Sequence, residues 1–90
     1  MAKPAVTKLP NPYRIQDLEG RIWVGIGICA GTSEAVHHVR AVLASAGIKP
    51  SIEGSVIYGI CVLEPDVKKA LGLLRDDEDA SIYKIELHVA

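Results

Sequence analysis

The sequence contains no phenylalanine, and its other aromatic residues are one tryptophan and three tyrosines among 90 residues. A core built from this chain must therefore be aliphatic. Such a core can form, because 49% of the residues are hydrophobic. The length predicts a single domain, since typical domains hold about 100 to 150 residues. A short chain buries a smaller share of its surface than a long one, and oligomerisation commonly compensates for this.

The chain also lacks an excess of one charge, since its formal net charge is −1 at pH 7. Nucleic acids and anionic membranes are bound through clustered lysine and arginine, so we expect neither as a partner. No apolar run reaches the roughly 18 residues that a membrane span needs. The N-terminal residues lack the apolar stretch of a secretory signal, and we expect a cytoplasmic protein. Two cysteines, Cys29 and Cys61, are too few for a secreted disulfide framework, and we expect both to be reduced.

Residues 1–20 contain three prolines and no sustained hydrophobic period, which predicts an irregular N-terminal arm. Residues 21–29 alternate in the manner of a strand. A helix is predicted over residues 33–46, because its apolar residues recur every three or four positions and Gly47 follows as a C-cap. In the strand, one predicted face carries Ile22, Val24, Ile26 and Ile28, and the other carries Trp23, Gly25, Gly27 and Cys29.

Two further strands and a second helix are predicted in the rest of the chain, before a last strand. Residues 48–55 predict a short strand and a turn, and Pro50 places that strand at a sheet edge. The apolar run 56–63 is typical of a central strand covered on both faces. Pro65 and Asp66 open the second helix, and residues 81–89 alternate cleanly as a strand. The order βαββαβ predicts an α+β, ferredoxin-like sandwich, with a four-stranded antiparallel sheet and two helices on one face.

With this element order, residues 21–89 resemble an ACT-like domain, which is a ferredoxin-like regulatory module. The predicted ACT-like domain therefore comprises residues 21–90. The resemblance also rests on "AGTSEAVHHVRAVLASAGIKPS" and "VIYGICVLEPDVKKALGLLRD". Gly31 matches the family's glycine between the first strand and the first helix. Gly47-Ile48 matches its glycine–isoleucine step into the second strand. Members that bind ligand usually carry Asp and Pro at the first turn, where this chain has Cys29 and Ala30.

The resemblance implies a homodimer or higher oligomer that holds a small, often amino-acid-like ligand. The ligand would lie between the first turn of one subunit and the second strand of its neighbour. Independently, the start of the helix offers free N–H groups and the hydroxyls of Thr32 and Ser33, which suit a carboxylate or a phosphate. The alternative is that Gly31 only makes a tight corner and Ser33 only caps the helix. The predicted ligand-binding residues are Ala30, Gly31, Thr32, Ser33, Ile48, Lys49 and Ser51.

Glycines inside the predicted strands indicate a close approach. Glycine weakens a strand by roughly 0.5 to 1 kcal/mol relative to alanine, and it is often found where another backbone or a ligand comes near. A smooth apolar sheet face would suit a second copy of the chain. The alternative is closer packing of the helices on the sheet. The predicted interface residues are Trp23, Gly25, Gly27, Cys29 and Gly59.

Neither a catalytic residue, a metal ligand nor a cofactor is predicted. His37 and His38 are adjacent on a helix and point about 100° apart, so the pair cannot easily bind one metal ion together. His37 lies opposite the apolar stripe of the helix and should be solvated. The acidic run 76–79 lacks the alternating ligands and the glycine of a calcium loop, and is predicted to be a solvated helix end. Glu86 and His88 are predicted to be a solvated pair. We therefore expect a non-enzymatic sensing or regulatory module. The alternatives are a ligand-free assembly protein that self-associates through its sheet and, less favoured, an enzyme.

Overall fold

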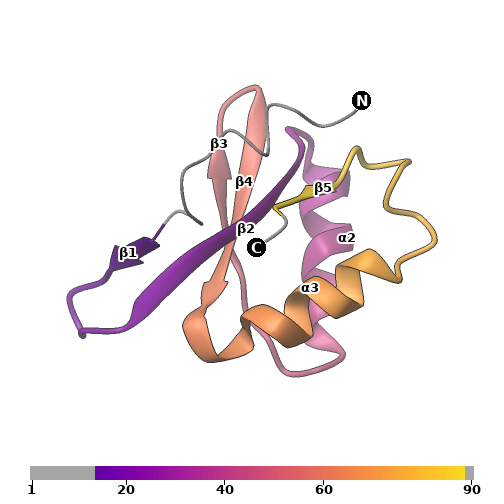
Figure 1. Ribbon diagram of the computed structural model, residues 1–90. Coiled ribbons are helices and arrows are strands. Elements are labelled where there is room, and N and C mark those ends of the chain that lie inside the picture. Colours follow the sequence, from indigo (N-terminus) through magenta and orange to yellow (C-terminus); the bar gives the residue numbers. More distant parts are fainter. Residues whose placement is uncertain (1–13, 89–90) are drawn as a thin grey trace.

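The computed structural model describes residues 14–88, which form a small α+β unit with a curled antiparallel sheet and two helices (Figure 1). The first helix and the last strand match the predicted types, but not all boundaries match. In chain order, the elements are strand β1 (Arg14–Gln16), strand β2 (Ile22–Ala30), helix α2 (Ser33–Ala44), strand β3 (Ser51–Gly54), strand β4 (Ile57–Leu63), the 3₁₀ turn η1 (Glu64–Asp66), helix α3 (Val67–Arg75) and strand β5 (Glu86–Leu87).

Strand β2 is the centre of the sheet. It pairs with β4 along one edge, and its other edge is shared by two short strands. Residues 22–24 pair with β1, and residues 27–28 pair with β5. Strand β3 pairs with β4 and, among the described residues, with no other strand. All these pairings are antiparallel, and β3 lies at the edge that Pro50 predicts.

The core is aliphatic, as the lack of phenylalanine predicts. Both helices lie on the same side of the sheet (Figure 1) and pack their apolar stripes against it. No polar or charged residue is fully buried among residues 14–88. Burial of aliphatic surface is therefore the main force that holds the two layers together. The buried residues are Val24, Ile26, Cys29, Ala35, Val39, Leu43, Ile48, Ile60, Val62, Ala70 and Leu74.

Helix α2 begins and ends for local reasons. The Thr32 side-chain oxygen accepts a hydrogen bond of 3.1 Å from the backbone N–H of Ala35, which satisfies one of the free donors of the first turn. The helix ends at Ala44, two residues before the predicted end. Gly47 then takes a φ of 75°, a left-handed conformation that suits glycine, and turns the chain into the strand that follows.

The predicted faces of the first strand are wrong for Ile28 and Cys29, beyond residue 26, because β2 contains a β-bulge. The register against β4 shifts between Gly25 and Gly27, so Ile26 is an extra residue on the β2 side. A bulge reverses the alternation of side chains that follows it. Cys29 therefore lies in the core, 1% exposed, while Ile28 lines the opposite face of the sheet.

The predicted last strand over residues 81–89 is also wrong in extent. Residues 81–84 form turns, and Lys84 has a φ of 54°, which a strand does not allow. Only Glu86 and Leu87 pair with β2, and residue 89 lies outside the described residues. The alternating apolar side chains nevertheless reach the core, because Tyr83, Ile85 and Leu87 all pack against it.

Two other predictions about the strands need correction. The N-terminal arm is not irregular throughout, since residues 14–16 form β1; the rest of the arm up to residue 13 lies outside the described residues. Strand β4 is central, as predicted, but the helices cover only one of its faces. Val62 points into the core, whereas Gly59 and Cys61 line a groove on the other face.

Gly27 is required by the close approach of β5. A Cβ atom at this position would collide with the backbone oxygen of Glu86 and touch Leu87. We predict that Gly27→Ala lowers the free energy of unfolding by about 1 to 3 kcal/mol, because it overpacks this contact. The measurement is urea unfolding followed by circular dichroism.

Gly72→Ala is the matched control, because a Cβ atom at Gly72 in α3 meets nothing within 4 Å. It should raise the free energy of unfolding by roughly 0.5 to 1 kcal/mol, the helix preference of alanine over glycine. Equal effects of the two variants would contradict the close approach of β5.

Candidate functional site

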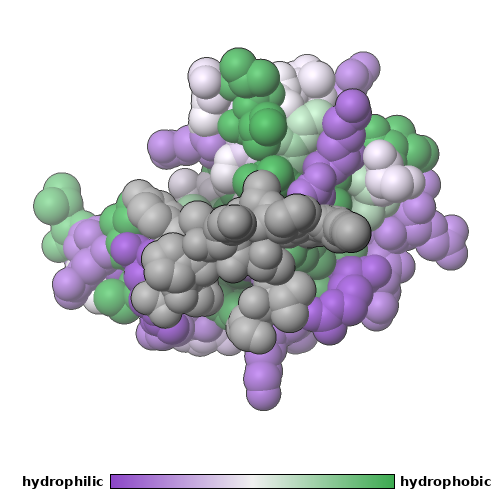
Figure 2. All heavy atoms as spheres, turned by 45° about the horizontal axis from the view of Figure 1, so that its top comes forward, coloured by the Kyte–Doolittle hydropathy of each residue, from purple (hydrophilic) through white to green (hydrophobic). Residues whose placement is uncertain are grey.

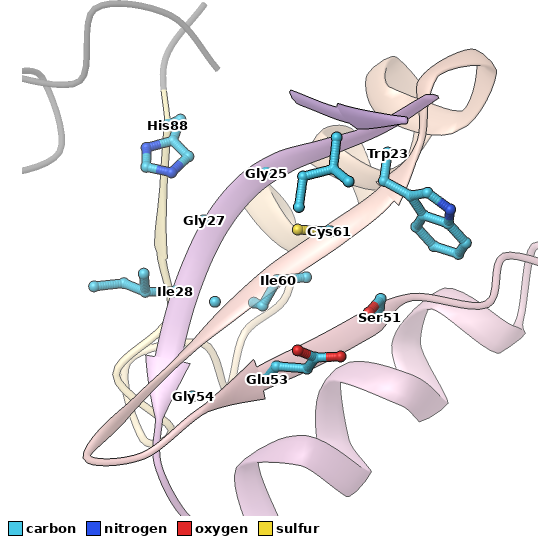
Figure 3. A pocket seen from close by; sticks show the side chains of 12 residues that line it. Trp23, Gly25, Gly27, Ile28, Ser51, Glu53, Gly54, Ile60, Cys61 and His88 are labelled. Atoms are coloured by element: carbon cyan, nitrogen blue, oxygen red, sulfur yellow. The ribbon is translucent and has the colours of Figure 1, made fainter. Parts of the chain in front are cut away.

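A groove lies on the face of the sheet opposite the helices (Figure 3). Its volume is about 580 Å³, within the roughly 300 to 1,000 Å³ range of small-molecule sites. Its described lining comes from the strands and from His88 just after β5, with none from α2 or α3. The lining residues are Ile15, Trp23, Gly25, Gly27, Ile28, Ser51, Glu53, Gly54, Gly59, Ile60, Cys61 and His88.

The floor of the groove follows from the strand register. Residues paired directly across antiparallel strands project to the same face. Gly25 faces Cys61, which in turn faces Ser51, and beyond the bulge Ile28 faces Gly59. Glycine adds no side chain to this face. The sheet surface is therefore hollow at Gly25 and Gly59, between neighbours that have larger side chains.

Trp23 forms one wall, and a carboxylate fixes its indole. The Trp23 Nε1–H donates a hydrogen bond of 2.9 Å to Oδ2 of Asp17, and the Arg21 Nε–H donates to the same oxygen. The other carboxylate oxygen, Oδ1, accepts hydrogen bonds from the backbone N–H groups of Glu19 and Arg21. The Arg21 guanidinium lies 5.8 Å from the centre of the Trp23 ring. The bond from Trp23 is the largest cause that lowers the pKa of Asp17 from 3.8 to about 2, and the bonds from Arg21 add to it.

Glu53 brings a negative charge to the opposite side of the groove. Among the lining residues that lie within 14–88, its carboxylate is the only formally charged side chain at pH 7 (Figure 3). Burial raises the pKa of the Cys61 thiol, and the charge of Glu53 raises it further. Cys61 is therefore a neutral thiol at neutral pH, and a weak nucleophile. Cys29 is likewise a free thiol whose pKa is raised by burial.

His88 closes the end of the groove beside β2. Its backbone N–H donates a hydrogen bond of 2.8 Å to the carbonyl of Ile26, the extra residue of the bulge. The side-chain Nδ1 is buried, and it has no hydrogen-bond partner among the described residues. Burial lowers the pKa of His88, so its imidazole is neutral at pH 7. The prediction of a solvated pair with Glu86 is therefore wrong for His88.

The predicted ligand-binding turn has a packing role. A Cβ atom at Gly31 would collide with the backbone oxygen of Val56, so the glycine is needed by the neighbouring β3–β4 turn. The Thr32 side chain already caps α2. This geometry accounts for both residues without a ligand.

The other predicted ligand-binding residues do not meet that turn within one chain. Ala30 pairs with Ile57 at one end of β4, whereas Ser51 pairs with Cys61 near the other end. Ile48 is 3% exposed in the core, and Lys49 and Ser33 are exposed. Of the predicted ligand-binding residues, only Ser51 lines the groove.

The predicted interface residues divide into three kinds. Trp23, Gly25 and Gly59 line the groove. Gly27 also lines it, but β5 occupies the space where its side chain would be. Cys29 is buried in the core, because the bulge turns it to the helix side.

Sequence reasoning missed a second polar site, formed by His38 of α2 and Asp77 of the acidic run. The His38 Nε2 and an oxygen of Asp77 lie 2.5 Å apart, although 39 positions separate the residues. His37 is exposed, as predicted. The acidic run is not simply solvated, because the side chain of Asp77 is only 9% exposed.

No protein-family model, no curated protein and no solved structure matches this chain. Within residues 14–88, none of the helices combines the length and the apolar character that crossing a membrane requires. The function of this site therefore has to be inferred from its own geometry.

The bond between Trp23 and Asp17 predicts a pKa that can be measured. Above pH 3.8 the Asp17 carboxylate is charged and stabilises the β1–β2 turn, and this contribution is lost as the pH falls through about 2. In Trp23→Phe the pKa of Asp17 should rise toward 3.8, because the largest lowering contact is gone. Carboxyl-carbon NMR titration measures it.

Tyr58→Phe is the control, since Tyr58 lies on β4 away from Asp17. It should leave the pKa of Asp17 at about 2. If Trp23→Phe left it there as well, the indole would not be what fixes this carboxylate.

Proposed function

We propose that this chain is a non-enzymatic, small-molecule-sensing module of the ACT-like kind, which acts as a homodimer and holds its ligand in the groove on the helix-free face of the sheet. One observation carries the proposal: a hollow of about 580 Å³ that is largely apolar and has a few polar groups at its sides. Sites for small organic molecules have this size and this mixture of surfaces.

The strand pairings support a ferredoxin-like sandwich as the fold behind this function. When β1 is set aside, the strands follow the spatial order β5–β2–β4–β3 across the sheet, and each strand is antiparallel to its neighbours. Along the chain from β2 to β5, helix α2 lies between β2 and β3, and helix α3 lies between β4 and β5. This is the order of a split βαβ pair. Strand β1 is an addition at the free part of the β2 edge.

The charges of the groove favour a ligand with an ammonium group and an apolar body. Glu53 supplies the negative charge. The floor of Gly25 and Gly59 and the ring of Trp23 offer apolar contact, on which an aliphatic side chain can rest. We infer an amino-acid-like ligand, with its ammonium group at Glu53. This places the ligand on the sheet face instead of the β2–α2 turn.

The protonation states of the groove support a binding role over a catalytic one. The pKa of the Cys61 thiol is raised, so little thiolate is present to attack a substrate. The pKa of His88 is lowered by burial, which keeps the imidazole neutral. No hydrogen bond within residues 14–88 joins these two side chains as a nucleophile and a base.

Titration with L-leucine and with its amine-free analogue 4-methylpentanoate tests the ligand class. The shifts of backbone amide signals in NMR report where each compound binds. We expect L-leucine to shift signals of residues 51–61 and the analogue to bind at least threefold more weakly. Glu53→Gln should weaken L-leucine binding by roughly threefold to tenfold, because a charged hydrogen bond near the surface is lost.

Glu34→Gln is the matched control, because Glu34 lies in the first turn of α2, next to the predicted ligand-binding turn. This variant should bind L-leucine as the unaltered protein does. Signals that shift around residues 30–34 and respond to Glu34→Gln would move the site to that turn. No binding of either compound by any variant would overturn the amino-acid-like ligand.

The second candidate function is a ligand-free assembly protein that uses the same sheet face. The specific observation in its favour is the smooth floor of glycines beside Trp23. The large apolar residues that are exposed belong to several segments of the chain, and they are Ile15, Leu18, Val56, Ile57 and Ile82. Figure 2 shows a hydrophobic protrusion at the left tip, the side on which the β1–β2 hairpin lies in Figure 1, and Leu18 of that hairpin is fully exposed.

Gly59→Arg distinguishes the two functions. A Cβ atom at Gly59 would make only an ordinary contact with the Glu53 backbone oxygen at 3.8 Å, so the fold should tolerate the change. The sensing module should keep the mass of a dimer in native mass spectrometry and lose L-leucine binding. An assembly protein should instead become a monomer. Gly72→Arg on α3 is the control and should change neither property.

A further inference from the structure

Three potential metal ligands from distant parts of the chain meet at one place. His38 lies on α2, and Asp77 and Asp79 lie in the turn that follows α3. One imidazole nitrogen and one carboxylate oxygen from each aspartate lie within 4.8 Å of one another. This cluster is separate from the groove, because none of the three residues lines it.

The imidazole of His38 is held in place on two sides. Its ring stacks on the ring of Tyr83, with centroids 4.4 Å apart and planes inclined by 20°. Its Nε2 atom faces Oδ2 of Asp77 at 2.5 Å. The side chains of His38 and Asp77 are 17% and 9% exposed, whereas Asp79 is exposed. The nitrogen of His38 and the oxygen of Asp77 are thus already oriented before any ion binds, and the carboxylate of Asp79 lies on the solvent side.

The local charge favours a cation. Residues 76–79 are all acidic, and they follow directly on α3. The C-terminal end of a helix carries a partial negative charge, so acidic residues at this end are unfavourable. The one basic residue in the last turn of α3 is Arg75. A divalent cation at the cluster would offset both the side-chain charges and the helix dipole.

We propose that His38, Asp77 and Asp79 bind one zinc ion, with water as the fourth ligand. One nitrogen and two carboxylate oxygens match the donors that zinc takes in proteins. Calcium and magnesium prefer oxygen alone, so the imidazole selects against them. Tetrahedral zinc bonds of about 2.0 to 2.2 Å place the ligand atoms roughly 3.3 Å apart. His38 and Asp77 then separate by a small side-chain movement, and Asp79 moves inward.

The ion would tie the turn after α3 to α2. That turn leads to Tyr83, whose carbonyl accepts a hydrogen bond of 2.9 Å from the N–H of Ala30 at the end of β2. From there the chain continues into β5 and His88. Zinc would therefore fix the path of the segment between α3 and β5. This role does not depend on whether the groove binds a ligand.

Isothermal titration calorimetry of the full chain without a histidine tag, with zinc chloride as the probe, tests the proposal. We expect one zinc ion per chain and a higher melting temperature in its presence. Cobalt chloride should give the visible absorption of a tetrahedral site with one nitrogen and oxygen ligands. His38→Gln and Asp79→Asn should each weaken zinc binding at least tenfold.

The controls are His37→Gln and Asp76→Asn, which change the exposed neighbours and should leave zinc affinity unchanged. His38→Gln also removes the stack on Tyr83 and could unfold the turn. Asp79→Asn avoids this difficulty, because the Asp79 side chain makes no hydrogen bond among the described residues. If zinc does not bind, or if Asp76→Asn and Asp79→Asn weaken it equally, the cluster is only a His38–Asp77 pair and the proposal fails.

Discussion

The β-bulge in β2 is the constraint on which the other features of this fold depend. One extra residue, Ile26, is inserted between Gly25 and Gly27 against the continuous strand β4. The inserted residue keeps its side chain in the core, and its carbonyl accepts the backbone N–H of His88. Beyond it, the alternation of side chains is reversed, so that Cys29 enters the core. A bulge also increases the local twist, which agrees with the curled sheet of Figure 1.

The bulge also explains why two short strands can share one edge of β2. β1 pairs before it and β5 pairs beyond it, and Gly27 leaves room for the backbone of β5. On the helix-free face, the same bend leaves a groove with Trp23 and Glu53 on its walls (Figure 3). A sheet face that is hollow and lined by apolar surface, with one carboxylate and one half-buried neutral imidazole, is better suited to holding a small molecule than to a flat contact. The sensing function proposed for this chain follows from that shape.

The features that depend on nearby residues could be predicted from the sequence, and those that depend on distant contacts could not. The buried stripe of Val39 and Leu43, the glycine after α2 and the edge position next to Pro50 all follow from local rules. The bulge could not be predicted, because an alternating pattern is read on the assumption that no residue is inserted. Residues 81–85 alternate because turns also bring every second side chain to the core. The contact between His38 and Asp77 had no sequence signal, since 39 positions separate the two residues.

The central claim is that the functional surface of this protein is the helix-free face of the sheet. A crystal structure of the protein after soaking with L-leucine tests it most directly, since it shows where the compound lies and which groups it contacts. The account predicts electron density for the amino acid above Gly59, with its ammonium nitrogen within hydrogen-bond distance of the Glu53 carboxylate. Density at the turn between β2 and α2, or a groove that holds only ordered water, would contradict it.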